Sequence, residues 1–181
     1  MSELTEFRWH GRGGQGAKTA ALLLADVAFK TGQNVQGFPE YGPERMGAPI
    51  TAYNRISQDV IRVHSNIYHP DYVVVVDETL LESVDVTAGL NKEEIMEHLK
   101  GYEGDVYTVD GRKISVDALG KNFPNSPMLA AIVAVSKVMP RDKFITEMRA
   151  SYEHKFAKKP EVIDGNMKAL EMAFDAVEAL M

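Results

Sequence analysis

Apolar and polar residues alternate with a period of two at the start of the chain, and helical spacing follows. In Thr5–His10 the aromatic residues Phe7 and Trp9 fall on one face, which predicts a β-strand. Ala17–Lys30 is apolar on most of its circumference, so we expect a helix that is covered on more than one side. Gly32 stands where a helix C-terminus favours glycine, and we expect it to end this helix.

Further strand patterns follow this helix. Asn34–Phe38 is a short strand, and Ile50–Ser57 and Val60–His64 flank a turn at residues 57–59, which predicts an antiparallel hairpin. Tyr72–Val76 is a β-branched run that ends at Asp77, as is typical of a central strand buried on both faces.

The second half of the chain is mainly helical. Apolar residues of the last predicted helix, residues 164–180, recur at intervals of three and four, namely Ile163, Met167, Leu170, Phe174, Val177 and Met181. The other predicted elements are helices over Asn91–Lys100, Ser115–Gly120, Pro127–Val138 and Asp142–Phe156, the last capped by Asp142, and a strand over Asp105–Val109. This alternation predicts an α/β fold: a three-layer α/β/α, Rossmann-like single domain over residues 1–181, with a mostly parallel sheet and an antiparallel hairpin.

Composition narrows the classes of function. The chain has 181 residues, no cysteine and a formal net charge of −6, so a cysteine-ligated metal cluster has no ligands here and a nucleic-acid partner is not expected. No apolar run reaches the length that spans a membrane, and residues 1–7 are polar and acidic, unlike a signal peptide. We therefore expect a cytoplasmic protein without a membrane partner.

The densest candidate chemistry lies between the first strand and the first helix. Four glycines fall within six residues in the run Gly11-Arg12-Gly13-Gly14-Gln15-Gly16, which Ala17-Lys18-Thr19 follows. Such a loop at a helix N-terminus forms a concave cradle of backbone N–H groups that binds anions, usually phosphates. The glycine loop, as we call Gly11–Gly16, is thus a candidate phosphate site.

Two common nucleotide motifs fit this loop poorly. A Walker loop needs lysine directly after its last glycine, but Ala17 intervenes and rotates Lys18 by about 100° around the helix. A dinucleotide site needs an acidic residue at the end of the second strand, where this chain has Gln36. Two interpretations then stand side by side: an anion cradle to which Arg12 adds a positive fork and Gln15 a neutral donor, or glycines that only permit tight packing.

A second dense stretch, Gly37–Pro49, contains three prolines and three glycines, and it is therefore conformationally restricted. It presents Glu40, Tyr41, Glu44 and Arg45, which favours a recognition surface. The alternative is a surface loop with an internal Glu–Arg pair.

Together these two stretches carry a resemblance. Trp9–Ala21 and Gln36–Pro49 closely resemble the gamma subunit of 2-oxoacid:ferredoxin oxidoreductases, most strongly the pyruvate type. The likeness continues through Tyr53–Ile56, Val73–Leu81, Asn125–Leu129 and the helix with Asn166, and so covers nearly the whole chain.

The resemblance implies a multi-chain enzyme that cleaves a 2-oxoacid with thiamine diphosphate and magnesium, passes electrons through iron–sulfur clusters to ferredoxin, and hands the acyl group to coenzyme A. The gamma chain is implied to be non-catalytic, with the thiamine site built by alpha and beta chains and the clusters held by beta and delta chains. The implied coenzyme A site comprises Gly11, Arg12, Gly13, Gly14, Gln15, Gly16 and Lys18. The implied contact with a neighbouring chain comprises Glu40, Tyr41, Gly42, Pro43, Glu44, Arg45, Met46 and Gly47. A stand-alone dinucleotide-binding oxidoreductase and a purely structural scaffold are the alternatives.

The remaining candidates have simple structural interpretations. Asp77 and Asp110 each follow a predicted strand, where they can meet a ligand or cap the next helix, and for Asn125 we favour capping. The five histidines lack metal-ligand spacing, and only His10 adjoins the glycine loop. No catalytic triad or carboxylate pair stands out, so no catalytic centre is predicted in this chain.

Overall fold

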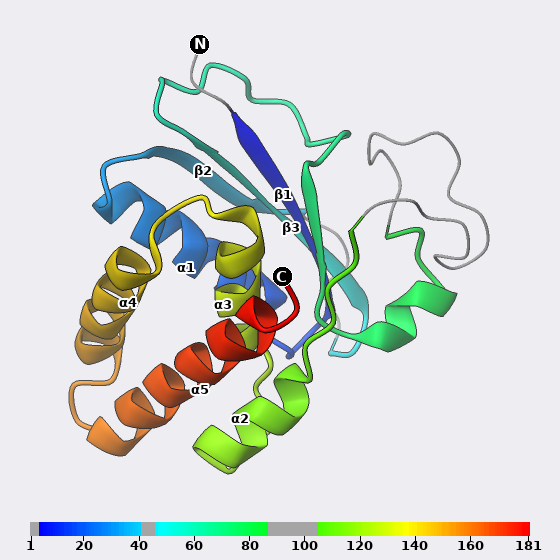
Figure 1. Ribbon diagram of the computed structural model, residues 1–181. Coiled ribbons are helices and arrows are strands. Elements are labelled where there is room, and N and C mark those ends of the chain that lie inside the picture. Colours follow the sequence, from blue (N-terminus) through cyan, green and yellow to red (C-terminus); the bar gives the residue numbers. More distant parts are fainter. Residues whose placement is uncertain (1–3, 41–45, 87–104) are drawn as a thin grey trace.

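A computed structural model describes residues 4–40, 46–86 and 105–181 (Figure 1). Its strands are β1 (Thr5–Arg12), β2 (Asn34–Pro39), β3 (Pro49–Ser57) and β4 (Tyr72–Val75). Its α-helices are α1 (Ala17–Lys30), α2 (Gly111–Leu119), α3 (Asn125–Ser136), α4 (Arg141–Lys155) and α5 (Pro160–Glu178), and a 3₁₀ helix, η1, covers Glu78–Glu82. The helix predicted over Asn91–Lys100 lies outside the described residues.

The four strands form one mixed sheet in the order β2-β3-β1-β4. β3 runs antiparallel to both β1 and β2, and only β1 and β4 pair in parallel. The α/β class is confirmed, but the prediction of a mostly parallel sheet is wrong. Because β3 separates β2 from β1, the chain does not form the β1–α1–β2 unit with adjacent parallel strands that defines a dinucleotide-binding fold.

The predicted hairpin is also wrong. Residues 60–64 form no strand, since both edges of β3 are already occupied by β1 and β2. The segment after β3 instead follows the sheet in extended form, where Gln36 Nε2 donates to the carbonyl of Val63 and Arg55 Nη2 to that of Asn66. Residues 105–109, predicted as a strand, likewise have no strand partner in the described part of the chain.

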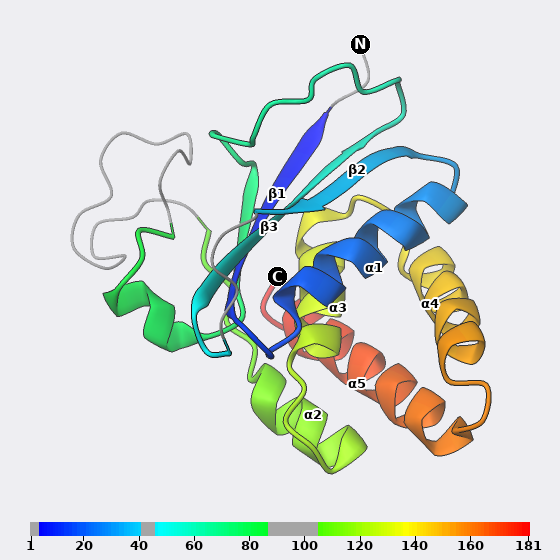
Figure 2. The same ribbon diagram turned by 180° about the vertical axis from the view of Figure 1, so that it is seen from behind.

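The five described α-helices lie on one side of the sheet in both views, rather than on both sides as predicted (Figures 1 and 2). α1 packs on β2 and β3, α3 reaches the sheet at β4, and α5 packs against α2, α3 and α4. Phe7 and Trp9 point into this core and are fully buried, as the alternation predicted. The face of β1 that carries Arg8 and His10 therefore lies away from the helices.

The helix boundaries show where local signals were sufficient. Gly32 follows α1 at φ 92°, and the stripe of α5 is buried as predicted at Ile163, Met167, Leu170, Phe174 and Val177, but Met181 is exposed. α5 begins earlier than predicted, with Pro160 in its first turn, and α2 spans more than the predicted turn. Asp142 is not the N-cap of α4: Pro140 holds that position, and its carbonyl accepts from the backbone N–H of Phe144.

Candidate functional site

The glycine loop connects the end of β1 to the start of α1 in a tightly packed path. Gly14 and Gly16 have φ values of 94° and 85°, in the left-handed region where side chains are strained. At Gly11 a Cβ atom would lie 2.7 Å from Cβ of Ala17, so strand and helix approach as closely as glycine permits. Two of the glycines are thus required by conformation and one by close packing.

The two motif-bearing loops are joined by backbone hydrogen bonds. The N–H of Gly13 donates to the carbonyl of Ala48 at 2.9 Å, and the N–H of Gly47 donates to the carbonyl of Gly13 at 3.0 Å. Sequence reasoning singled out the loops separately, and the structure makes them one surface at the N-terminus of α1. Lys18 lies half-buried in the first turn of that helix.

Arg12 and Gln15 are held by residues that follow β4. The guanidinium of Arg12 donates to Thr79 Oγ1 from Nε (3.1 Å) and Nη2 (2.8 Å), and to the carbonyl of Gly47 from Nη1 (3.2 Å). Its Nε also lies 3.4 Å from a carboxylate oxygen of Asp77. Gln15 Oε1 accepts from the backbone N–H of Arg12, and its Nε2 donates to Asp77. The guanidinium of Arg12 is therefore held in place by residues of two other segments.

Asp77 caps η1, which is one of the two roles expected for it from the sequence, and it also faces the glycine loop. Its Oδ1 accepts from both the backbone N–H and the hydroxyl of Thr79. The hydrogen bond from the Thr79 hydroxyl, followed by those from Gln15 and the backbone and by the charge of Arg12, lowers the pKa of Asp77 against the effect of burial. The carboxylate therefore stays ionised beside Arg12.

Thr79 is a contact that sequence reasoning missed. The only local signal is its place two residues after a strand-ending aspartate, the spacing of an Asx-type turn. Asp110 caps α2 through the N–H of Lys113, as expected. Asn125 does not cap α3, because Pro124 is the N-cap, and its side chain instead packs where a Cβ on Gly16 would project.

The predicted neighbour-contact loop is only partly described. Glu40, Met46 and Gly47 flank its centre, while Tyr41, Gly42, Pro43, Glu44 and Arg45 lie outside the described residues. Met46 is 89% exposed, an unusual position for a large apolar side chain. Glu40 is bonded to the sheet, since its carboxylate accepts from Tyr53 Oη at 3.0 Å. Burial first, and then this hydrogen bond, raises the pKa of Tyr53 to about 12.

A buried polar pair lies on the sheet face that the helices leave free. Arg8 Nε donates to His10 Nε2 at 3.1 Å, and Arg8 Nη2 donates to the carbonyl of Val86 at 2.9 Å. Burial first, and then the charge of Arg8, lowers the pKa of His10 to about 4. His10 is therefore a neutral hydrogen-bond acceptor at neutral pH, with its proton on Nδ1.

This pair makes stability depend on pH. Between pH 6.5 and 4 the unfolded chain binds a proton at His10 and the folded chain does not, so the free energy of unfolding falls as pH drops through this window. The shift of the pKa from 6.5 to about 4 corresponds to about 3 kcal/mol. We expect denaturant titrations of His10→Gln, which keeps a neutral acceptor, to lack this part of the pH dependence. Parallel pH profiles for the two proteins would contradict the assignment.

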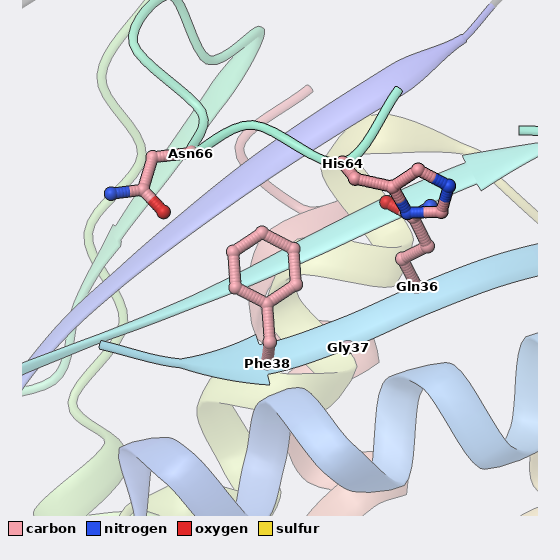
Figure 3. A pocket seen from close by; sticks show the side chains of 5 residues that line it. All are labelled: Gln36, Gly37, Phe38, His64 and Asn66. Atoms are coloured by element: carbon pink, nitrogen blue, oxygen red, sulfur yellow. The ribbon is translucent and has the colours of Figure 1, made fainter. Parts of the chain in front are cut away.

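A shallow depression beside β2 is distinct from the glycine loop. Gln36, Gly37 and Phe38 of β2 line it together with His64 and Asn66 of the extended segment (Figure 3). Arg55 connects three of these residues: it donates to Gln36 and to the carbonyl of Asn66, and its guanidinium lies 5.7 Å from the Phe38 ring centroid. The depression includes none of the residues predicted for the coenzyme A site.

Among the described residues, no group of three or more His, Asp or Glu side chains is arranged to hold a metal ion. None of the described helices combines the length and apolar character needed to cross a membrane.

Known proteins resemble this chain over most of its length. The family model for pyruvate ferredoxin/flavodoxin oxidoreductase matches residues 6–176. The pyruvate synthase subunit PorC of Thermotoga maritima is 40% identical over 184 residues, covering 96% of this chain and 94% of its own. The common subunit gamma of the pyruvate/ketoisovalerate oxidoreductases of Thermococcus kodakarensis is also 40% identical over 184 residues. The match covers 95% of this chain and 96% of that subunit.

Solved structures share the fold. The crystal structure of pyruvate oxidoreductase subunit PORC from Thermotoga maritima matches with a TM-score of 0.78 at 37% identity, covering 96% of this chain and 97% of that chain. The 2-oxoglutarate:ferredoxin oxidoreductase of Magnetococcus marinus, with 2-oxoglutarate, coenzyme A and succinyl-CoA bound, matches with a TM-score of 0.75 at 17% identity. It covers 100% of this chain and 32% of that larger chain, and at this identity it shows the fold alone.

The chain belongs to the pyruvate ferredoxin/flavodoxin oxidoreductase family. Within that family it is a gamma-type subunit of a multi-subunit 2-oxoacid:ferredoxin oxidoreductase, since PorC and common gamma subunits match it over nearly their whole length. The family predicted from the two loop motifs is confirmed.

Proposed function

We propose that this chain serves a cytoplasmic pyruvate:ferredoxin oxidoreductase, in which its glycine loop holds phosphate groups of coenzyme A. The names of its relatives support pyruvate as the substrate. Alpha, beta and delta chains are the proposed partners and would carry thiamine diphosphate, magnesium and the iron–sulfur clusters, which fits a chain without cysteine. Residues 1–181 then act as one non-catalytic domain, and the loop at Glu40–Gly47 contacts a neighbouring chain.

The observation that carries the coenzyme A proposal is the joined pair of loops at the start of α1. Gly13 bonds to Ala48 and Gly47, and the Arg12 guanidinium donates to the carbonyl of Gly47, so the guanidinium lies at the joined loops that precede α1. A guanidinium has five N–H groups, and among the described residues Thr79 and Gly47 accept from three of them. Arginine bonded in this way retains donors suited to a phosphate.

The fold weakens the dinucleotide alternative. A nicotinamide dinucleotide site uses a second strand parallel and adjacent to the first, with an acidic residue at its end that binds the ribose. Here β3 lies between β1 and β2. The chain therefore lacks the strand arrangement that such a site requires, and the carboxylate that follows β2, that of Glu40, is hydrogen-bonded to Tyr53.

Arg12→Ala tests the proposal in the reconstituted complex. Loss of one charge-assisted hydrogen bond to phosphate corresponds to about tenfold in affinity. We expect the KM for coenzyme A to rise about tenfold while kcat stays close to normal. With pantetheine, the phosphate-free part of coenzyme A, as acyl acceptor the same substitution should leave KM unchanged.

Two comparisons separate phosphate binding from support of the loop. Arg149→Ala removes an arginine from an exposed position of α4, where its guanidinium lies 3.7 Å from a carboxylate oxygen of Asp164, and is the matched control expected to leave both KM values unchanged. If Arg12→Ala raised the KM for pantetheine as much as that for coenzyme A, Arg12 would support the loop and not bind phosphate.

A further inference from the structure

A closed ring of hydrogen bonds links the glycine loop to the segment after β4. From the guanidinium of Arg12 it passes to the hydroxyl of Thr79, then to the carboxylate of Asp77, the amide of Gln15 and back to the backbone N–H of Arg12. Arg12 and Thr79 are 67 residues apart in the chain, so the ring connects two separate segments at the edge of the sheet.

Elementary chemistry fixes the direction of each bond. Arginine has no acceptor, so Thr79 Oγ1 must accept from both Nε and Nη2 of Arg12. The single proton of the hydroxyl is then donated to Asp77 Oδ1, which lies at 2.7 Å and also accepts from the backbone N–H of Thr79. With its proton donated to Asp77, the hydroxyl has both lone pairs directed to the two guanidinium N–H groups.

The ring and the carbonyl of Gly47 together order the guanidinium of Arg12. Nε and Nη2 share the hydroxyl of Thr79, and the carbonyl of Gly47 accepts from Nη1. A long arginine side chain loses considerable rotamer freedom when it binds a ligand, and one that is already ordered loses less. A guanidinium held along Nε is therefore prepared to meet an anion with its remaining N–H groups.

We propose that Thr79 is the positioning residue for the phosphate contact of Arg12. This inference rests on the coenzyme A site proposed above and adds a residue outside both sequence motifs. Thr79 acts through Arg12 and does not touch the ligand. Because its side chain lies at an exposed position, substitution there leaves the core intact.

The test compares Thr79→Val with Thr79→Ser in the reconstituted complex. Valine keeps the shape but removes the hydroxyl, and we expect the KM for coenzyme A to rise about fivefold with kcat and the KM for pantetheine unchanged. Serine keeps the hydroxyl and should restore a KM close to that of the unchanged protein. An effect on kcat, or the same rise with pantetheine, would overturn the positioning role.

A double substitution separates this inference from the proposed site. In a chain that already carries Arg12→Ala, Thr79→Val should add nothing further, because Thr79 acts through Arg12. If Arg12→Ala raises the KM for coenzyme A and Thr79→Val does not, the site stands and the positioning role fails. If Arg12→Ala itself has no effect, the site fails. Should the valine variant not assemble, Thr79→Ala takes its place with the same expected values.

Discussion

Asn54→Ala is expected to lower the free energy of unfolding by about 4 kcal/mol. Asn54 is fully buried between the sheet and α1, where its Oδ1 accepts from Trp9 Nε1 at 2.8 Å and its Nδ2 donates to the carbonyl of Ala21 at 2.8 Å. Alanine removes both bonds, leaves the indole N–H without its acceptor and opens a cavity. Chemical denaturation of the isolated chain measures the change.

Asn34→Ala is the matched control. Asn34 donates to the carbonyl of Gln58 at an exposed site, where water replaces the lost bond, so we expect a loss of roughly 0.5 kcal/mol or less. A double substitution with Trp9→Phe should cost less than the sum of the two single ones, since both remove the same buried bond. If Asn54→Ala were as mild as Asn34→Ala, the two buried hydrogen bonds of Asn54 would not anchor β3 to β1 and α1.

The periodicity of apolar residues was sufficient to predict the buried face of a single helix or strand. The alternation around Phe7 and Trp9 placed both rings in the core, and the stripe from Ile163 to Val177 placed the buried face of α5. These predictions succeed because a period of two or of 3.6 is written in consecutive residues.

The consecutive residues of a strand do not indicate which other strands pair with it. Ile50–Ser57 was correctly predicted as strand, but its neighbours are β1 and β2 and not the adjacent segment 60–64. Alternation with a period of two indicates which face of a strand is buried, but it does not indicate which strands pair with its two edges. A hairpin with residues 60–64 would need the shortest connection. The pairing of β3 with β1, which is more distant in the sequence, is the one that brings Asn54 against Trp9.

In the candidate site, too, one part could be predicted from the sequence and another could not. Glycine spacing identified the loop, because positive φ and close approach leave a compositional trace at Gly14, Gly16 and Gly11. The bond between Arg12 and Thr79 leaves no such trace, since threonine at an exposed position is common and its partner lies in a distant segment. Only the fold brings the two together.

Gly16→Ala is expected to lower the free energy of unfolding by about 4 kcal/mol, through two separate costs. Gly16 has a φ of 85°, a conformation that strains any side chain, and a Cβ there would lie 2.9 Å from Cβ of Asn125. Because α1 and α3 meet at this point, relief of the contact requires the glycine loop or the start of α3 to move. We expect the KM for coenzyme A to rise in the assembled complex as well.

Gly32→Ala separates the two costs, because Gly32 flanks the other end of the same helix. Its φ is 92°, but a Cβ there would meet no atom within 4 Å, so only the backbone strain applies and the expected loss is about 1 kcal/mol. The difference between the two variants, measured by denaturant titration, reports the contact with Asn125 alone. Equal losses at the two glycines would mean that the start of α1 is free to shift away from α3, and the rigid cradle proposed for coenzyme A would lose its structural basis.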